Sequence, residues 1–101
     1  MDYLTPEQII KLRNDLNMSR SQFGELFSIR QESIRAWEFG MAKPSEMNNA
    51  YLIKLKEKVE QDSANNVKDT VGKILLGAGF LALLTYVFSD DTKKPKQKKS
   101  G

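Results

Sequence analysis

The polar residues near position 31 are the first in this chain whose types and spacing suggest a chemistry. Gln31, Glu32, Ser33 and Arg35 lie close together in one segment. Gln can form a bidentate pair with adenine, Arg can read guanine or grip phosphate, and Glu can accept a hydrogen bond from N4 of cytosine. On the first turns of a helix, such a set could contact base edges in the major groove.

Three basic residues outside this segment could contact phosphates instead. Arg20 is expected at the start of the preceding helix, and Arg30 and Lys43 are expected in loops. Basic side chains near helix N-termini bind phosphate oxygens well and fix the position of a protein on DNA. The candidate DNA-binding residues are therefore Arg20, Arg30, Gln31, Glu32, Ser33, Arg35 and Lys43.

Few residues of the types used in catalysis or metal binding occur in the chain. The 101 residues include no His and no Cys, and no clustered Ser–Lys pair is visible. The composition excludes disulfides, thiol chemistry and the common zinc sites. The sequence argues against an enzyme, and it predicts no catalytic residue, no metal site and no cofactor.

Two short helices on a tight turn are expected to position the candidate residues. Ser19 is a suitable N-cap for a helix over 20–27, and Gln22 completes an S-x-x-Q capping box. The second helix should run over 31–39 and stop at Gly40. Apolar residues recur at helical spacing in both segments, so each helix should bury one face.

Residues typical of one known protein family occur in this pair of helices and on both sides of it. These residues are Met18-Ser19, Phe23-Gly24, the run 27–31, Ile34 and the run 37–40, with the run 5–8 upstream and Lys43-Pro44-Ser45 downstream. Over roughly residues 4–60 the chain resembles the phage-repressor/Cro-like (XRE) family of helix-turn-helix proteins. The resemblance implies an all-α, lambda-repressor-like domain of four or five helices over 1–61. It also implies a transcriptional regulator, often a repressor, that binds double-stranded operator DNA as a homodimer.

The chain departs from the family pattern at three positions. Arg20 stands where the family often has Gln, and Gly24 stands where it has another small residue, usually Ala. Arg30 replaces the Ser or Thr that usually caps the recognition helix. The missing cap should weaken the start of that helix by about 1 kcal/mol.

Arg13 is a charged residue on the apolar face of a helix predicted from Pro6 to about Leu16. One interpretation is a snorkelling side chain whose charged end stays in water. The other is a structural ion pair with Glu38, because the family pairs an Arg at this position with the Glu that follows the aromatic residue. We favour the ion pair, which would hold the first helix against the recognition helix.

The positive charge of the chain is concentrated at its C-terminus. Residues 1–60 hold nine basic and nine acidic residues, whereas 90–101 hold five Lys against two Asp. The net charge of +3 is therefore no argument for DNA binding by the helical domain, which depends on where its arginines point. A lysine-rich tail over 90–101 is expected to be a solvated, disordered end.

A nearly uncharged segment follows a polar linker predicted over 62–70. The run 71–88 carries one charge, Lys73, and its length lies at the short end of the about 17–25 residues that span a bilayer. Its glycines would weaken a helix in water but are common in membrane helices. We therefore predict a separate hydrophobic helix over 71–89 that crosses the membrane; the alternative is a soluble oligomerisation element.

The predicted function combines these parts. The chain should be a sequence-specific DNA-binding regulator of a bacterium or its phage, tethered to the inner membrane with its DNA-binding domain in the cytoplasm. The lysines of the tail also favour the cytoplasmic side, and one crossing cannot satisfy both. The alternative function is a membrane-associated adaptor that uses the same helical fold to hold a protein partner.

Overall fold

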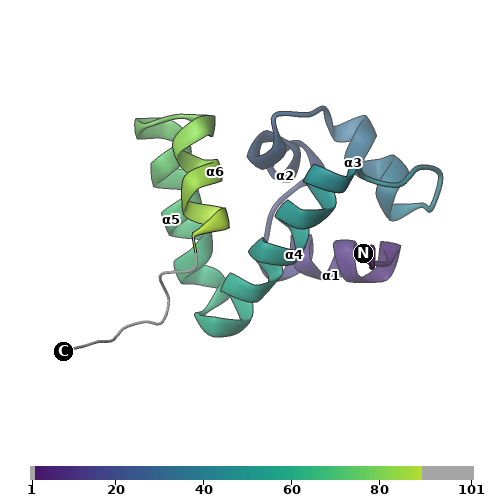
Figure 1. Cartoon of the computed structure of the whole chain (residues 1–101), viewed down its shortest axis with the longest axis horizontal. Helices are drawn as coiled ribbons and strands as arrows, with labels where there is room; N and C mark the ends of the chain where they lie inside the picture. Colours follow the sequence, from purple (N-terminus) through teal and green to yellow (C-terminus); the bar gives the residue numbers. More distant parts are fainter. Residues whose placement is uncertain (1, 90–101) are drawn as a thin grey trace.

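Six α-helices follow one another in the computed structural model, which describes residues 2–89 (Figure 1). No strand occurs within this range, so the all-α fold class predicted from the sequence is confirmed. The helices are α1 (Pro6–Asp15), α2 (Arg20–Phe27), α3 (Gln31–Glu38), α4 (Glu46–Gln61), α5 (Ala64–Gly77) and α6 (Phe80–Phe88).

Local capping explains where most of these helices begin. The Thr5 hydroxyl accepts from the backbone N–H of Gln8, and the Gln8 side chain accepts from the backbone N–H of Thr5. Ser19 and Gln22 form the same reciprocal pair at the start of α2. Each box satisfies two donors that a helix N-terminus otherwise leaves without a partner. The boundaries predicted at these two helix starts agree with the structure.

One hydrophobic core is shared by all six helices. Its buried members include Ile9 of α1, Phe23 of α2, Trp37 of α3, Leu52 of α4 and, from the last two helices, Val67, Val71, Leu83 and Val87. In Figure 1, α4 crosses the middle of the molecule, with the antiparallel pair α5 and α6 to its left, α1 and α3 to its right, and α2 between α6 and α3. The C-terminal helices therefore complete the same core as the N-terminal ones.

The prediction of a separate hydrophobic helix over 71–89 must be corrected. The segment divides between the end of α5 and α6, with a break at Ala78 and Gly79, where Gly79 has a φ of +93°. Leu83 and Val87 are fully buried against the rest of the protein, so much of the segment's apolar surface belongs to the common core. No helix among residues 2–89 combines the length and the hydropathy needed to cross a membrane.

The expected linker over 62–70 also differs from the structure. Residues 64–70 form the first half of α5, and only a sharp corner separates α4 from α5. At that corner Ser63 caps α5, and the carboxylate of Asp62 accepts from the side chain of Asn66 and the backbone of Ser63. These hydrogen bonds lower the pKa of Asp62. The lysine-rich tail predicted over 90–101 lies outside the described residues.

A buried lysine connects α6 to α4. The ammonium group of Lys58 donates to the backbone carbonyl of Ser89, the C-cap of α6, at 3.2 Å, and it lies 4.6 Å from the centre of the Tyr86 ring. Lys58 is only 6 % exposed. A cation at this end of a helix stabilises the exposed carbonyl dipoles, and the aromatic ring adds a cation–π contact. Lys58 therefore helps to hold α6 in the fold.

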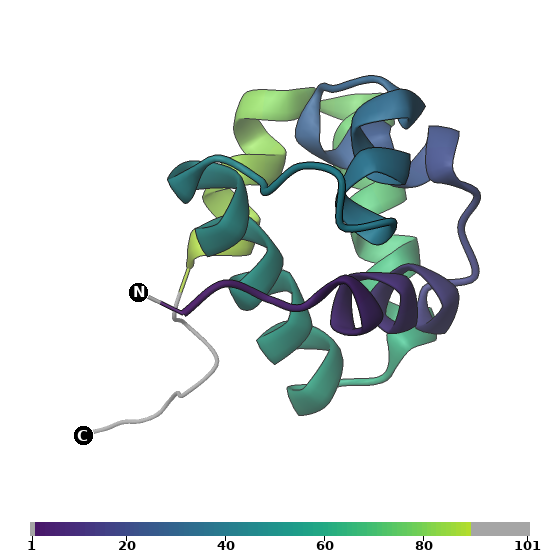
Figure 2. The same ribbon diagram turned by 90° about the vertical axis from the view of Figure 1, so that its right-hand side faces the viewer.

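The N-terminal segment is fixed by a buried amide on α4. The side-chain oxygen of Asn49 accepts from the backbone N–H of Leu4 at 3.0 Å, and its nitrogen donates to the carbonyl of Asp2 at 2.9 Å. Figure 2 shows this segment passing beside α4 before it enters α1. Asn49 thus holds the segment before α1 against α4.

Candidate nucleic-acid interface

α3 carries most of the candidate residues, and its inner face is firmly anchored. Ile34 and Trp37 are buried, and the Trp37 ring meets the Phe27 ring edge to face with centroids 5.7 Å apart. Phe27 in turn packs on Tyr51 of α4 at 4.3 Å. Aromatic contacts of this kind add to the stabilisation from buried area. They fix the rotation of α3, and with it the direction of its outward side chains.

The carboxylate of Glu38 joins three helices. Its side chain is fully buried, and its two oxygens accept from Arg13 of α1, Nε to Oε2 at 2.6 Å and Nη2 to Oε1 at 3.1 Å. The remaining terminal nitrogen of Arg13 donates to the backbone carbonyl of Met18 at 3.1 Å. The structure thus contains the Arg13–Glu38 ion pair as a bidentate contact, the geometry in which Arg–carboxylate pairs are strongest.

A second arginine shares this carboxylate. Nε of Arg20 donates to Oε1 of Glu38 at 2.9 Å, and the Arg20 side chain is 35 % exposed. The sequence suggested only a phosphate contact for Arg20 and gave no sign of this pairing. The two arginines with one buried carboxylate leave a net positive charge at the junction of α1, α2 and α3. Part of the Arg20 guanidinium therefore remains available to solvent.

The outward face of α3 is polar and accessible. Gln31, Glu32, Ser33 and Arg35 are all exposed, so the structure brings these four predicted residues together on one helix surface. Arg30 occupies the N-cap position of α3 and makes no side-chain capping hydrogen bond. The Ser33 N–H bonds to the carbonyl of Arg30 at 3.0 Å, whereas the N–H groups of Gln31 and Glu32 receive no side-chain cap, as expected where a helix lacks a capping Ser or Thr.

Phe39 also belongs to this surface, and its contacts with two arginines were not predicted from the sequence. Its ring is 55 % exposed at the C-terminal end of α3. The guanidinium of Arg35 lies 4.7 Å from the ring centre and that of Arg20 lies 5.6 Å from it. A ring in contact with two guanidinium groups restricts their movement. The spacing of Arg35 and Phe39, four residues apart on one helix, is the signal that could have indicated the contact.

The turn between α2 and α3 depends on a close backbone approach. Gly24 lies in α2, and a Cβ atom built on it would lie only 2.7 Å from the carbonyl oxygen of Ile29. Ser28 ends α2 in the left-handed conformation, with φ of +58°. The backbone of the turn therefore packs directly against α2, and any side chain at Gly24 would push α3 away.

Lys43 lies apart from the cluster on α3. It is exposed in the loop before α4, and its ammonium group is 5.3 Å from the centre of the Tyr3 ring. The candidate surface therefore consists of the exposed face of α3 with the adjoining side chains of Arg20, Arg30 and Phe39. Lys43 is not part of this surface as defined, because it lies in the loop between α3 and α4.

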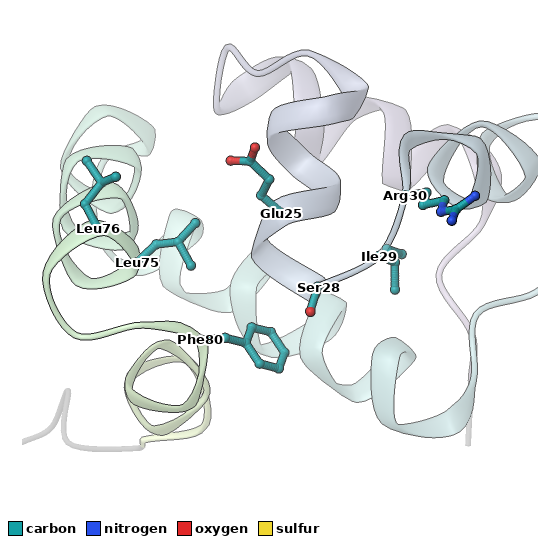
Figure 3. A pocket seen from close by; sticks show the side chains of 7 residues that line it. All are labelled: Glu25, Ser28, Ile29, Arg30, Leu75, Leu76 and Phe80. Carbon is teal, nitrogen blue, oxygen red and sulfur yellow. The ribbon is translucent and has the colours of Figure 1, made fainter.

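A shallow hollow lies beside this surface. It has a volume of about 470 Å³ and separates the end of α2 and the following turn from α5 and α6 (Figure 3). Its lining combines Glu25, Ser28, Ile29 and Arg30 with Leu75, Leu76 and Phe80. Among residues 2–89, no group of three or more acidic, His or Cys side chains is placed to hold a metal ion.

Comparison of the chain with protein-family models, with curated proteins and with solved structures found no significant match.

Proposed function

We propose that this protein binds double-stranded DNA in a sequence-dependent manner through α3 and acts as a transcriptional regulator. The observation that carries the proposal is the exposed set Gln31, Glu32, Ser33 and Arg35 on a helix whose opposite face is fixed by Ile34, Trp37 and Glu38. Base readout needs donors and acceptors held in one direction, because each base pair presents its own pattern in the major groove.

The proposed contacts divide into two kinds. Gln31 and Arg35 would meet base edges, with Glu32 and Ser33 beside them, while Arg30 and Lys43 would meet phosphates. Arg20 would reach a phosphate only through the part of its guanidinium that does not face Glu38. The open N–H groups at the start of α3 favour an anionic oxygen at the same place.

The resemblance to the XRE family supports the same proposal and adds a homodimer on a two-fold symmetric operator. Two copies of α3 would then enter major grooves about one helical turn, roughly 34 Å, apart. Association with the inner membrane remains part of the expectation from sequence, but the proposed DNA contact does not depend on it.

The decisive experiment uses the full chain, because Val67, Val71, Leu83 and Val87 complete the core and a fragment ending at residue 66 would lack them. Selection of binding sites from a random duplex pool should enrich one sequence. Fluorescence anisotropy at several salt concentrations should then show tighter binding to that duplex than to a scrambled one. Lys11→Ala on α1 is the control for loss of a surface charge, since Lys11 pairs with Asp15 and not with the α3 surface.

A second candidate function is binding of a protein partner, and one observation favours it. Three large apolar side chains are exposed at the end of α3 and the start of α4, namely Phe39 at 55 %, Met41 at 70 % and Met47 at 59 %. Exposed apolar side chains mark interaction sites where they form one contiguous patch. If no duplex is enriched and binding is undetectable even at low salt, the DNA proposal fails and this adaptor function becomes the better one.

A further inference from the structure

Among residues 2–89, the most exposed large apolar side chains lie at the turn between α5 and α6. Leu76 is 91 % exposed and Leu81 is 77 % exposed, and Gly77 and Ala78 between them are exposed as well. We call the residues 75–81 the apolar tip. It is the end of the antiparallel helix pair in Figure 1, away from the corner that joins α4 to α5.

Charge is absent from the tip and begins one helical turn behind it. Along α5, the exposed residues change from Asp69 to Lys73 to Leu76 as the tip is approached. Along α6, Leu81 is followed by Thr85, also exposed. The outer surface of the helix pair is thus apolar at its end and polar behind, with a cation at the boundary. This order suits the layers of a bilayer surface, where apolar side chains enter the acyl region and lysines meet anionic headgroups.

The size of the tip argues against a second copy as its occupant. A stable protein interface buries about 800 Å² on each partner, with a packed apolar centre. Only two side chains of the tip, Leu76 and Leu81, are strongly exposed, and Leu75 and Phe80 are half-buried, so the tip offers less than that area. The neighbouring hollow extends the apolar surface only toward Ile29, because Glu25, Ser28 and Arg30 supply the rest of its other wall (Figure 3).

We propose that the apolar tip inserts into the surface layer of a bilayer that contains anionic lipids, with Lys73 at headgroup level. The proposal goes beyond DNA binding and does not rest on it. It also differs from a membrane span, since α5 and α6 keep their packing on α4 and only their joined end enters the lipid. The excess of lysine in the sequence after residue 92 adds attraction to an anionic surface.

The backbone of the tip limits how deeply it can enter. The N–H groups of Ala78 and Gly79 both bond to the carbonyl of Ile74, at 2.7 and 2.9 Å, so the turn itself is satisfied. α6, however, has no side-chain cap, and its first N–H groups need an external acceptor. Headgroup oxygens and interfacial water supply one, whereas the hydrocarbon core does not. Insertion should therefore stop at the interface.

The test is co-sedimentation of the full chain with lipid vesicles. Vesicles of phosphatidylcholine with about one-third phosphatidylglycerol should carry the protein down at low and moderate salt. The double variant Leu76→Ser/Leu81→Ser should lower the partition coefficient roughly tenfold or more, because it removes the apolar surface that enters the lipid. Met41→Ser/Met47→Ser is the matched control: it changes two other exposed apolar residues, at 70 % and 59 %, and should leave partition unchanged.

A depth measurement separates insertion from simple charge attraction. Ala78→Trp places a reporter on the exposed turn, and lipids brominated near the headgroup end of the acyl chain should quench it well beyond the quenching of the native Trp37. Equal partition of the Leu76→Ser/Leu81→Ser variant would assign binding to the lysines alone and would overturn the proposal. So would a dimer in sedimentation equilibrium that this variant dissociates, or absence of vesicle binding by a parent chain whose circular dichroism shows it folded.

Discussion

Nε of Arg20 lies 2.9 Å from Oε1 of Glu38, the same oxygen that accepts from Arg13. Arg20, which the sequence suggests as a phosphate contact, thus donates one hydrogen bond to a buried carboxylate. The shared carboxylate ties the start of α2 to the end of α3, so the orientation of the candidate DNA surface and the stability of the fold depend on the same group.

The first prediction concerns this carboxylate. Glu38→Ala should lower the free energy of unfolding by about 3–5 kcal/mol, because it leaves the mostly buried Arg13 without its partner. Arg13 is 14 % exposed and Arg20 35 %, so Arg13→Ala should cost more than Arg20→Ala. Urea denaturation followed by circular dichroism measures both, with Glu25→Ala on the exposed face of α2 as the control. A Glu38→Ala midpoint equal to that of the control would mean that the pair contributes little.

The second prediction separates base contacts from phosphate contacts. Arg35→Ala and Gln31→Ala should each reduce discrimination between the selected duplex and its mismatched versions, by about 1–3 kcal/mol for a lost bidentate contact. Arg30→Ala should weaken binding to all duplexes alike and reduce the slope of log K against log salt by about one. Arg20→Ala should change that slope less than Arg30→Ala, because Arg20 is shared with Glu38. Anisotropy titrations at several salt concentrations decide this; unchanged preference in both α3 variants would exclude α3 as the reading helix.

The third prediction compares two helical glycines, Gly72 with open space around it and Gly24 against the backbone of the following turn. Gly→Ala inside a helix ordinarily stabilises by up to about 1 kcal/mol, and Gly72→Ala in α5 should do so because nothing lies within 4 Å of the new Cβ. Gly24→Ala should instead destabilise by about 1–3 kcal/mol, since its Cβ would lie 2.7 Å from the carbonyl oxygen of Ile29. Thermal and urea denaturation of the two variants should move in opposite directions. If both stabilise, the α2–α3 turn does not pack as closely as the structure indicates.

The fourth prediction concerns Tyr51. Its hydroxyl is buried and has no hydrogen-bond partner among the described residues, while its ring packs against Phe27 and Phe88. Tyr51→Phe should therefore be neutral or should stabilise by up to about 1 kcal/mol, because an unsatisfied buried group is removed. A loss of more than about 1 kcal/mol in urea denaturation would instead show that the hydroxyl has a partner.

Alkaline pH gives an independent check on the same residue. Burial raises the pKa of Tyr51 above its ordinary value of 10.0, so the folded protein retains this proton at a pH where the unfolded chain releases it. The free energy of unfolding is therefore independent of this group below about pH 10 and declines as the pH rises further, because ionisation favours the unfolded chain. Tyr51→Phe should remove that part of the decline. The comparison of the two proteins at pH 8 and above 10 isolates it from the other tyrosines.

Local sequence was sufficient for the helices that begin with a capping box. Thr5 with Gln8 and Ser19 with Gln22 specify their helix starts through contacts three residues apart, so no distant part of the chain is needed. The polar face of α3 could also be predicted, because helical spacing alone places Ile34 and Trp37 opposite the exposed residues. Arg13 on an apolar face indicated that it needs a partner, although only the family resemblance suggested that the partner is Glu38.

Only the tertiary structure showed whether the apolar segment 71–88 is buried in the protein core. The segment 71–88 reads as a membrane span because a bilayer and a protein core both accept apolar side chains, and hydropathy does not distinguish them. Glycine at 79 allows the chain to reverse, and the reversal brings Leu83 and Val87 onto α4 while leaving Leu76 and Leu81 in solvent. The pairing of Arg20 with Glu38 was equally invisible, because the two residues are 18 positions apart and meet only when α2 packs against α3. Capping and periodicity are local and can be predicted from the sequence, whereas the burial of each side chain depends on which other helices cover it.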